Sequence, residues 1–222
     1  MWGMDSGSMA GPANLKLARN RNSSSGVRQR LPFQFPGTAN DVARLSGRLR
    51  RAFSAVGFPK STRLSVLNLA CGRADETGAL AAALAPVEIA HYLGIDLRPD
   101  AIAEAARRWT LPGGTLEFRC GDASAIDRLV SQVDLIFIRH QNYWDDPPVW
   151  DRLLENALKS LKPDGLLVCT SYFDREHELL VAALKTRGAE VLWNVRAPDS
   201  RALPDAPEKS VDRHLVVFRK PE

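Results

Sequence analysis

Two acidic residues and a loop of small residues follow successive apolar runs, in positions where they could hold a nucleoside. The loop reads Asn68-Leu69-Ala70-Cys71-Gly72-Arg73-Ala74 and closes the apolar run 64–69. Its small residues let the backbone approach a bound molecule closely. Asp96 ends the next apolar run, where its carboxylate can accept hydrogen bonds from both ribose hydroxyls, and Asp122 follows the third, where it can accept one from the exocyclic amine of an adenine.

A second group of polar and aromatic residues follows the fourth apolar run. It reads Arg139-His140-Gln141-Asn142-Tyr143-Trp144. His140 can act as a general base, because an unperturbed histidine has a pKa of about 6.5. Tyr143 can position a second substrate, and these two are the candidate catalytic residues. The alternative is that His140 only caps its strand while Tyr143 and Trp144 belong to the core.

Several other chemistries are disfavoured. The loop contains only Gly72, so it lacks the GxGxxG of dinucleotide-binding proteins, and the chain has no GK[ST] phosphate loop. Cys71, Cys120 and Cys169 are far apart and form no CxxC pair, so we expect no metal site and reduced thiols, as in a cytoplasmic protein. No apolar run suggests a signal peptide or approaches the roughly 20 residues of a membrane span.

The periodicity of apolar residues predicts the strands and helices that position these residues. Strands are expected at 64–69, 91–97, 116–120, 133–139, 166–171, 190–195 and 214–219, and helices at 40–56, 75–84, from Pro99, at 125–130, after the N-cap Asp146 to residue 161, and at 175–187. Repeated strand–helix units imply parallel pairing with helices on both faces. Residues 196–213 are expected to be a loop, so the final strand can lie antiparallel. The prediction is an α/β fold with a doubly wound, mostly parallel seven-stranded sheet whose last strand is antiparallel.

Three regions follow from composition. Residues 1–30 are rich in Gly, Ser, Asn and Arg and are expected to form a disordered basic arm, which could touch nucleic acid. Residues 31–60 comprise a proline-bounded apolar stretch, which could be a lid or plain packing, and the first helix. Residues 61–222 form the main domain. The net charge of +4 owes much to the arm.

In their order and spacing, these motifs resemble the class I S-adenosylmethionine-dependent methyltransferases, which have a Rossmann-like fold. The resemblance rests on 66–76, Ile95-Asp96, Gly121-Asp122-Ala123, 133–136 and 161–165. It implies S-adenosylmethionine as the cofactor and a set of contact residues: Asn68, Ala70, Cys71, Gly72, Asp96, Leu97, Asp122, Ala123 and Arg139. The family's acidic residue after the first strand is Asn68 here, and two of its glycines are Ala70 and Ala74. The ligand's ammonium group would then face a neutral partner.

The functional hypothesis is methyl transfer to an unidentified small-molecule or protein side-chain acceptor, with no membrane partner. Two alternatives stay open. The first is a methyltransferase-like domain that binds or assembles without catalysis, which the changes at Asn68, Ala70 and Ala74 would suit. The second is a nucleic-acid methyltransferase that uses the basic arm.

Overall fold

A seven-stranded sheet forms the centre of the protein in a computed structural model, which describes residues 26–58, 61–128 and 132–220. The strand order is β5-β3-β2-β6-β7-β11-β8. β11 runs antiparallel to the other six strands, which are parallel to one another, so the predicted sheet is confirmed. The strands are β2 (Arg63–Leu69), β3 (Glu88–Asp96), β5 (Thr115–Cys120), β6 (Val133–Ile138), β7 (Leu161–Ser171), β8 (Glu190–Arg196) and β11 (His214–Arg219).

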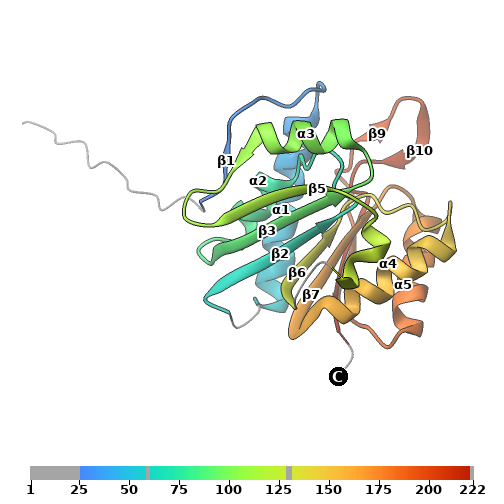
Figure 1. Cartoon of the computed structure of the whole chain (residues 1–222). Coiled ribbons are helices and arrows are strands. Elements are labelled where there is room, and N and C mark those ends of the chain that lie inside the picture. The colour runs from blue at the N-terminus through green and yellow to red at the C-terminus, as the bar shows by residue number, and fades with distance from the viewer. Residues whose placement is uncertain (1–25, 59–60, 129–131, 221–222) are drawn as a thin grey trace, which may run out of the picture.

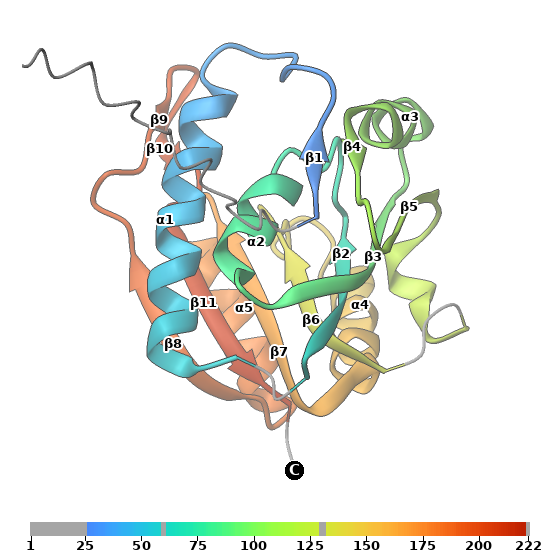
Figure 2. The same ribbon diagram turned by 90° about the vertical axis from the view of Figure 1, so that its left-hand side faces the viewer.

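Helices cover both faces of the sheet because side chains alternate along its strands. On β2, Val66 packs in the cluster that includes α1 and α2, whereas Leu67 packs in the cluster that includes α4 and α5. Figure 2 shows α1 and α2 in front of the sheet and α4 and α5 behind it. The helices are α1 (Thr38–Val56), α2 (Thr77–Leu84), α3 (Pro99–Arg108), α4 (Pro147–Ser160) and α5 (Asp174–Thr186).

Helix boundaries follow the local sequence signals. Gly57 ends α1 with a φ of 81°, and its N–H donates to the Phe53 carbonyl at 2.9 Å. Asp146 caps α4 as predicted, since its carboxylate accepts a hydrogen bond from the Val149 N–H at 3.3 Å. The short helix expected at 125–130 is a 3₁₀ helix over Ala123–Arg128, and the last two residues of the expected segment lie outside the described residues.

Two segments differ from the prediction. The stretch 196–213 is not a plain loop, because β9 (Ala202–Leu203) and β10 (Ala206–Ser210) form a hairpin in it. The predicted disordered arm lies outside the described residues as far as residue 25, but its end is ordered: β1 (Arg28–Gln29) pairs with β4 (Trp109–Thr110). The strands β1, β4 and β9 have two residues each and are too short to show an alternating pattern, and the five residues of β10 do not alternate between apolar and polar, so local sequence could not reveal them.

The apolar stretch before α1 lies against the end of α3 and the loop after β2. The Phe33 ring is 6.3 Å from the Trp109 ring, and Phe35 lies over the guanidinium of Arg73 at 5.1 Å. The views in Figures 1 and 2 put this stretch and the β9–β10 hairpin at the same end of the molecule. None of the helices in the described ranges is long and apolar enough to cross a membrane.

Candidate active site

A cavity of about 300 Å³ lies at the carboxyl ends of the central strands. Its lining comes from the loop after β2, the start of α2 and the residues that follow β3, β6 and β7. In an open α/β sheet this edge is where ligands bind. The lining residues are Ala70, Cys71, Gly72, Arg73, Asp75, Glu76, Arg98, Arg139, His140 and Tyr172.

The loop after β2 turns tightly around this cavity. Ala70, Gly72 and Ala74 all have left-handed backbone conformations, with φ values of 52°, 55° and 51°. A Cβ atom on Gly72 would lie 2.7 Å from Nη2 of Arg98, so a side chain here would collide with that guanidinium. The predicted contacts Ala70, Cys71 and Gly72 are therefore together at the cavity wall.

Asp96 ties this loop to the end of β3. One carboxylate oxygen accepts a hydrogen bond from the Gly72 N–H at 2.7 Å, and the other accepts from the backbone N–H and Nε of Arg98, both at 3.0 Å. Burial alone would raise the pKa of Asp96, but these hydrogen bonds outweigh it and lower the pKa below its usual value. The carboxylate is thus ionised at neutral pH, so both of its oxygens can accept hydrogen bonds from a diol.

Asn68 does not reach the cavity. It is fully buried, and its amide Nδ2 donates to Glu76 and to the Tyr92 hydroxyl, the latter at 2.8 Å. Glu76 lines the cavity instead, and burial raises its pKa although Arg139 opposes the shift. The expectation of a contact through Asn68 is corrected: Glu76 supplies the acidic group at this end, because the turn brings it back beside β2. Sequence reasoning missed Glu76, which has no distinguishing pattern.

His140 stands on the opposite wall, after β6. Its Nε2 lies 2.9 Å from Oδ1 of Asp212, and its ring stacks on Tyr172 with centroids 3.9 Å apart. Burial lowers the pKa of His140 below its ordinary value, although the Asp212 carboxylate acts in the other direction. The imidazole is therefore neutral near pH 7 and able to take up a proton.

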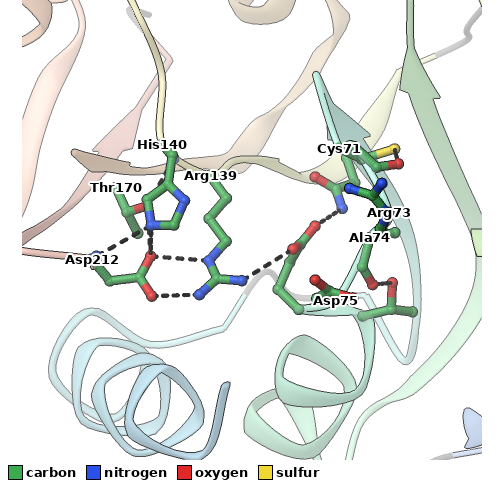
Figure 3. A network of polar contacts seen from close by, with 12 residues as sticks. Cys71, Arg73, Ala74, Asp75, Arg139, His140, Thr170 and Asp212 are labelled. Carbon is green, nitrogen blue, oxygen red and sulfur yellow. Dashed lines mark hydrogen bonds and ion pairs between the residues drawn. The ribbon is translucent and has the colours of Figure 1, made fainter. Parts of the chain in front are cut away.

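Arg139 connects the two walls of the cavity. Its Nε and Nη2 donate to the two oxygens of Asp212 at 3.0 and 2.7 Å, and its Nη1 lies 3.6 Å from Oε2 of Glu76. Figure 3 shows the resulting row of contacts from His140 through Asp212 and Arg139 toward the loop after β2. Asp212 precedes β11 and was also missed, since nothing in the local sequence relates it to residues after β6.

Tyr143 is turned away from this site. Its hydroxyl donates to Asp151 of α4 at 2.7 Å, and its ring packs against the core between the sheet and α4. Placing Tyr143 beside His140 in the site is therefore wrong: the chain turns after Gln141, whose amide side chain is fully buried and accepts the Tyr143 N–H at 2.8 Å.

The remaining predicted contacts lie farther along the same edge. Leu97 is 69% exposed, and Ala123 is buried in the core. The exposed Asp122 accepts a hydrogen bond from the Ser124 N–H at 2.8 Å. The preceding Gly121 N–H donates to the Asp96 carbonyl at 3.0 Å, so β3 and β5 hold these residues next to the cavity rather than in its wall.

Comparison with known proteins identifies a methyltransferase domain in this chain. A family model described as a methyltransferase domain matches residues 66–165, which carry the loop, Asp96, Asp122 and His140. Residues 66–165 thus carry a methyltransferase domain, and the chain is similar to the class I S-adenosylmethionine-dependent methyltransferases. The cofactor of this methyltransferase is S-adenosylmethionine, whose carboxylate and ammonium groups suit a cavity lined by both cationic and anionic side chains.

Solved structures agree with this fold. The N-methyltransferase NodS from Bradyrhizobium japonicum is 21% identical, with 84% of this chain and 99% of that chain covered and a TM-score of 0.60. A structure of NodS in complex with S-adenosyl-L-homocysteine is 22% identical, covers 85% and 90% of the two chains, and has a TM-score of 0.59. An S-adenosylmethionine-dependent methyltransferase from Clostridium acetobutylicum is 13% identical, with 82% and 92% covered and a TM-score of 0.60. No curated protein matches this methyltransferase.

Proposed function

We propose that this methyltransferase acts on a proton-bearing nitrogen or oxygen of a small molecule or protein side chain, with His140 as the general base. The observation that carries the proposal is a neutral imidazole at the cavity wall, held by the buried carboxylate of Asp212. A residue kept neutral by burial and oriented by a carboxylate is suited to remove a proton.

The residues divide the chemistry between them. S-adenosylmethionine supplies a methyl group activated by a sulfonium. The Asp96 carboxylate would hold the ribose hydroxyls, while Arg73 and Glu76 would bind the charged amino-acid part. The acceptor atom forms a bond to the methyl carbon as the carbon–sulfur bond breaks, and His140 takes the proton that the acceptor loses.

We infer that the acceptor enters past two aromatic side chains, of which Phe173 directly follows the cavity-lining Tyr172. Trp144, which is 48% exposed, and Phe173 meet edge to face with centroids 6.2 Å apart. The Lys209 ammonium lies 5.8 Å from the Trp144 ring and 5.4 Å from the Phe173 ring. Aromatic faces of this kind attract cations. Amines are the first acceptors to test, and the N-methyltransferase NodS, which shares the fold, supports that order.

Cofactor binding is tested by titrating S-adenosylhomocysteine calorimetrically into the Asp96→Ala variant. Loss of charge-assisted hydrogen bonds costs about 1.5–3 kcal/mol, which weakens affinity roughly 10- to 150-fold. Asp134→Asn is the control, because Asp134 is equally buried but its carboxylate binds Lys162 and Ser65 rather than the cavity. Equal affinity in the wild type and Asp96→Ala would contradict the ribose assignment.

The role of His140 as the base is tested once a screen of amines has yielded an acceptor. His140→Ala should lower turnover by roughly 10²–10⁴-fold and leave S-adenosylhomocysteine affinity intact. Unchanged turnover would remove His140 from the mechanism. If RNA or DNA were the acceptor, and its methylation were lost on deletion of residues 1–25, the nucleic-acid alternative would replace the amine proposal.

We also propose a cytoplasmic location. Cys71, Cys120 and Cys169 are all free thiols, which suits a reducing compartment. Fractionation of the producing cells tests this location. Recovery of the protein in the membrane or secreted fraction would contradict it.

A further inference from the structure

The carboxylate of Asp212 lies beside the cavity and has several hydrogen-bonding and charged partners. It accepts two hydrogen bonds from Arg139 and one from the Thr170 hydroxyl at 3.0 Å, and it faces His140 Nε2 at 2.9 Å. The side chain is 1% exposed, and Arg48 donates to its backbone carbonyl at 2.7 Å. Despite burial, the neighbouring Arg139 and His140 hold the pKa of Asp212 well below its usual range. Asp212 is thus a fixed anion.

Two groups of Asp212 compete for the same nitrogen of His140. The carboxylate lies 2.9 Å from Nε2 and the backbone N–H lies 3.2 Å from it. A neutral ring nitrogen either donates to the first or accepts from the second. The bond to an ionised carboxylate is the stronger one, so Nε2 carries the proton. Nδ1 is then the basic atom, and Figure 3 shows the other ring nitrogen turned away from Asp212.

The backbone supports a functional origin for this pair. His140 and Asp212 have φ values of 58° and 51°, a region that residues other than glycine rarely adopt. Such conformations cost free energy and are concentrated at functional sites. Here the two residues with unfavourable conformations contact each other, His140 from the segment after β6 and Asp212 from the segment before β11.

We propose that Asp212 is the positioning residue of this methyltransferase, fixing His140 in the Nε2–H form so that Nδ1 receives the proton from the acceptor. The inference rests on the proposed role of His140 as base. Since Asp212 also holds Arg139, which approaches Glu76, the same carboxylate sets the relative position of the base and the cofactor side of the cavity.

The first test needs neither an acceptor nor a variant of Asp212. The full chain contains four histidines, so long-range ¹H–¹⁵N spectra can resolve each imidazole, and His140→Gln assigns the signal. In the wild type at pH 7.5 (about one unit above an ordinary histidine pKa), the His140 signals should be those of the Nε2–H tautomer. The Nδ1–H tautomer would overturn the proposal, and this outcome can be read even if a variant at Asp212 does not fold.

The second test removes the charge with Asp212→Asn. The charged groups around His140 are Asp212, Arg139 and Asp41 of α1, and Tyr172 stacks on the ring. Losing the Asp212 anion should lower the His140 pKa further, because the carboxylate opposes the effect of burial. The acidic limb of the pH–rate profile should move the same way, with turnover reduced roughly tenfold or more. In the control Asp134→Asn, the His140 titration should stay unchanged.

Calorimetry with S-adenosylhomocysteine separates the two proposals. If the wild type fails to bind it, the proposed function fails whatever His140 does. If the wild type binds it and the His140 titration is the same in Asp212→Asn, the proposed function stands and the positioning role of Asp212 is wrong.

Discussion

At the scale of single residues, Arg98 is the side chain most directly in competition with a ligand. Its Nε donates to Asp96, the carboxylate we assign to the ribose, and its Nη2 lies over Gly72. The Arg98 side chain is 59% exposed, so its ion pair is screened by water and contributes about 0–1 kcal/mol. A bound ribose can displace this interaction at small cost.

Arg98→Ala should therefore bind S-adenosylhomocysteine slightly more tightly than the wild type, by up to about fivefold. The reason is that Asp96 loses its intramolecular side-chain partner but keeps the backbone bonds that hold it in place. Isothermal titration calorimetry measures this change. Arg107→Ala, at an exposed position of α3, the helix that Arg98 precedes, is the control. A loss of affinity in Arg98→Ala would mean that the guanidinium binds the ligand itself.

At the scale of elements, α1 and the hairpin β9–β10 hold the segment that carries Asp212. Arg48 of α1 donates to Asp199 at 2.8 Å and to the Asp212 carbonyl, and Arg201 pairs with Asp41. The Ser210 N–H donates to the Tyr172 carbonyl at 2.9 Å. These contacts join the first helix to the segment before the last strand, so α1 is part of the site's support.

Removing this link should destabilise the protein. Arg48→Met leaves the Asp212 carbonyl without a partner and should lower the free energy of unfolding by about 1–3 kcal/mol, since an unsatisfied buried acceptor costs this much. Urea unfolding monitored by circular dichroism measures the change. Arg44→Met, which removes a partly exposed partner of Asp41, should cost less than about 1 kcal/mol. Equal losses in the two variants would contradict the linking role of Arg48.

A second prediction at this scale concerns the contribution of the strand β1 to stability. Deletion of residues 1–30 removes the pairing with β4 and the hydrogen bond from the Arg30 N–H to the Arg108 carbonyl at 2.7 Å, whereas deletion of residues 1–25 keeps both. The longer deletion should be less stable than the shorter one by about 1–2 kcal/mol, because several backbone hydrogen bonds are lost. Thermal unfolding of the two truncated proteins measures the difference. Identical melting temperatures would show that β1 contributes nothing.

At the scale of the whole molecule, stability depends on pH through buried groups such as Glu176. Glu176 is 1% exposed, and its carboxylate accepts the Tyr172 N–H at 2.6 Å. Burial raises its pKa from 4.5 to about 7, although hydrogen bonds from backbone N–H groups oppose the shift. Because the folded pKa is the higher one, the folded state binds the proton more tightly. The contribution to stability is complete below pH 4.5 and is lost as pH rises through 7.

Glu176→Gln should remove the cost of burying a charged carboxylate at high pH. Glutamine can still accept the hydrogen bond from the Tyr172 N–H without carrying a charge. At pH 8 (an alkaline condition, about one unit above the raised pKa) the variant should be more stable by about 1–3 kcal/mol. This advantage should shrink as the pH falls and disappear below pH 4.5, where the wild-type carboxyl becomes protonated in the unfolded state as well as in the folded state. Chemical unfolding across this range measures it. Glu178→Gln, at an exposed position of the same helix, should change stability by less than about 0.5 kcal/mol at any pH.

The sequence by itself determined the sheet, its reversed last strand and the residues of the loop after β2. These follow from apolar periodicity and turn chemistry, which are local properties. Asp96 could also be placed, because parallel strands end at the same edge and the residue that closes a strand must lie there.

Only the tertiary structure decided which charges meet. Asn68 is buried, and Glu76 lines the cavity in its place. His140 lines the cavity, whereas the Tyr143 side chain points away from it toward Asp151. The partner of His140 is Asp212, which is distant in sequence and is brought close by the insertion of β11 between β7 and β8. Such a pairing depends on strand order and on two left-handed residues, and neither has a local periodic signature.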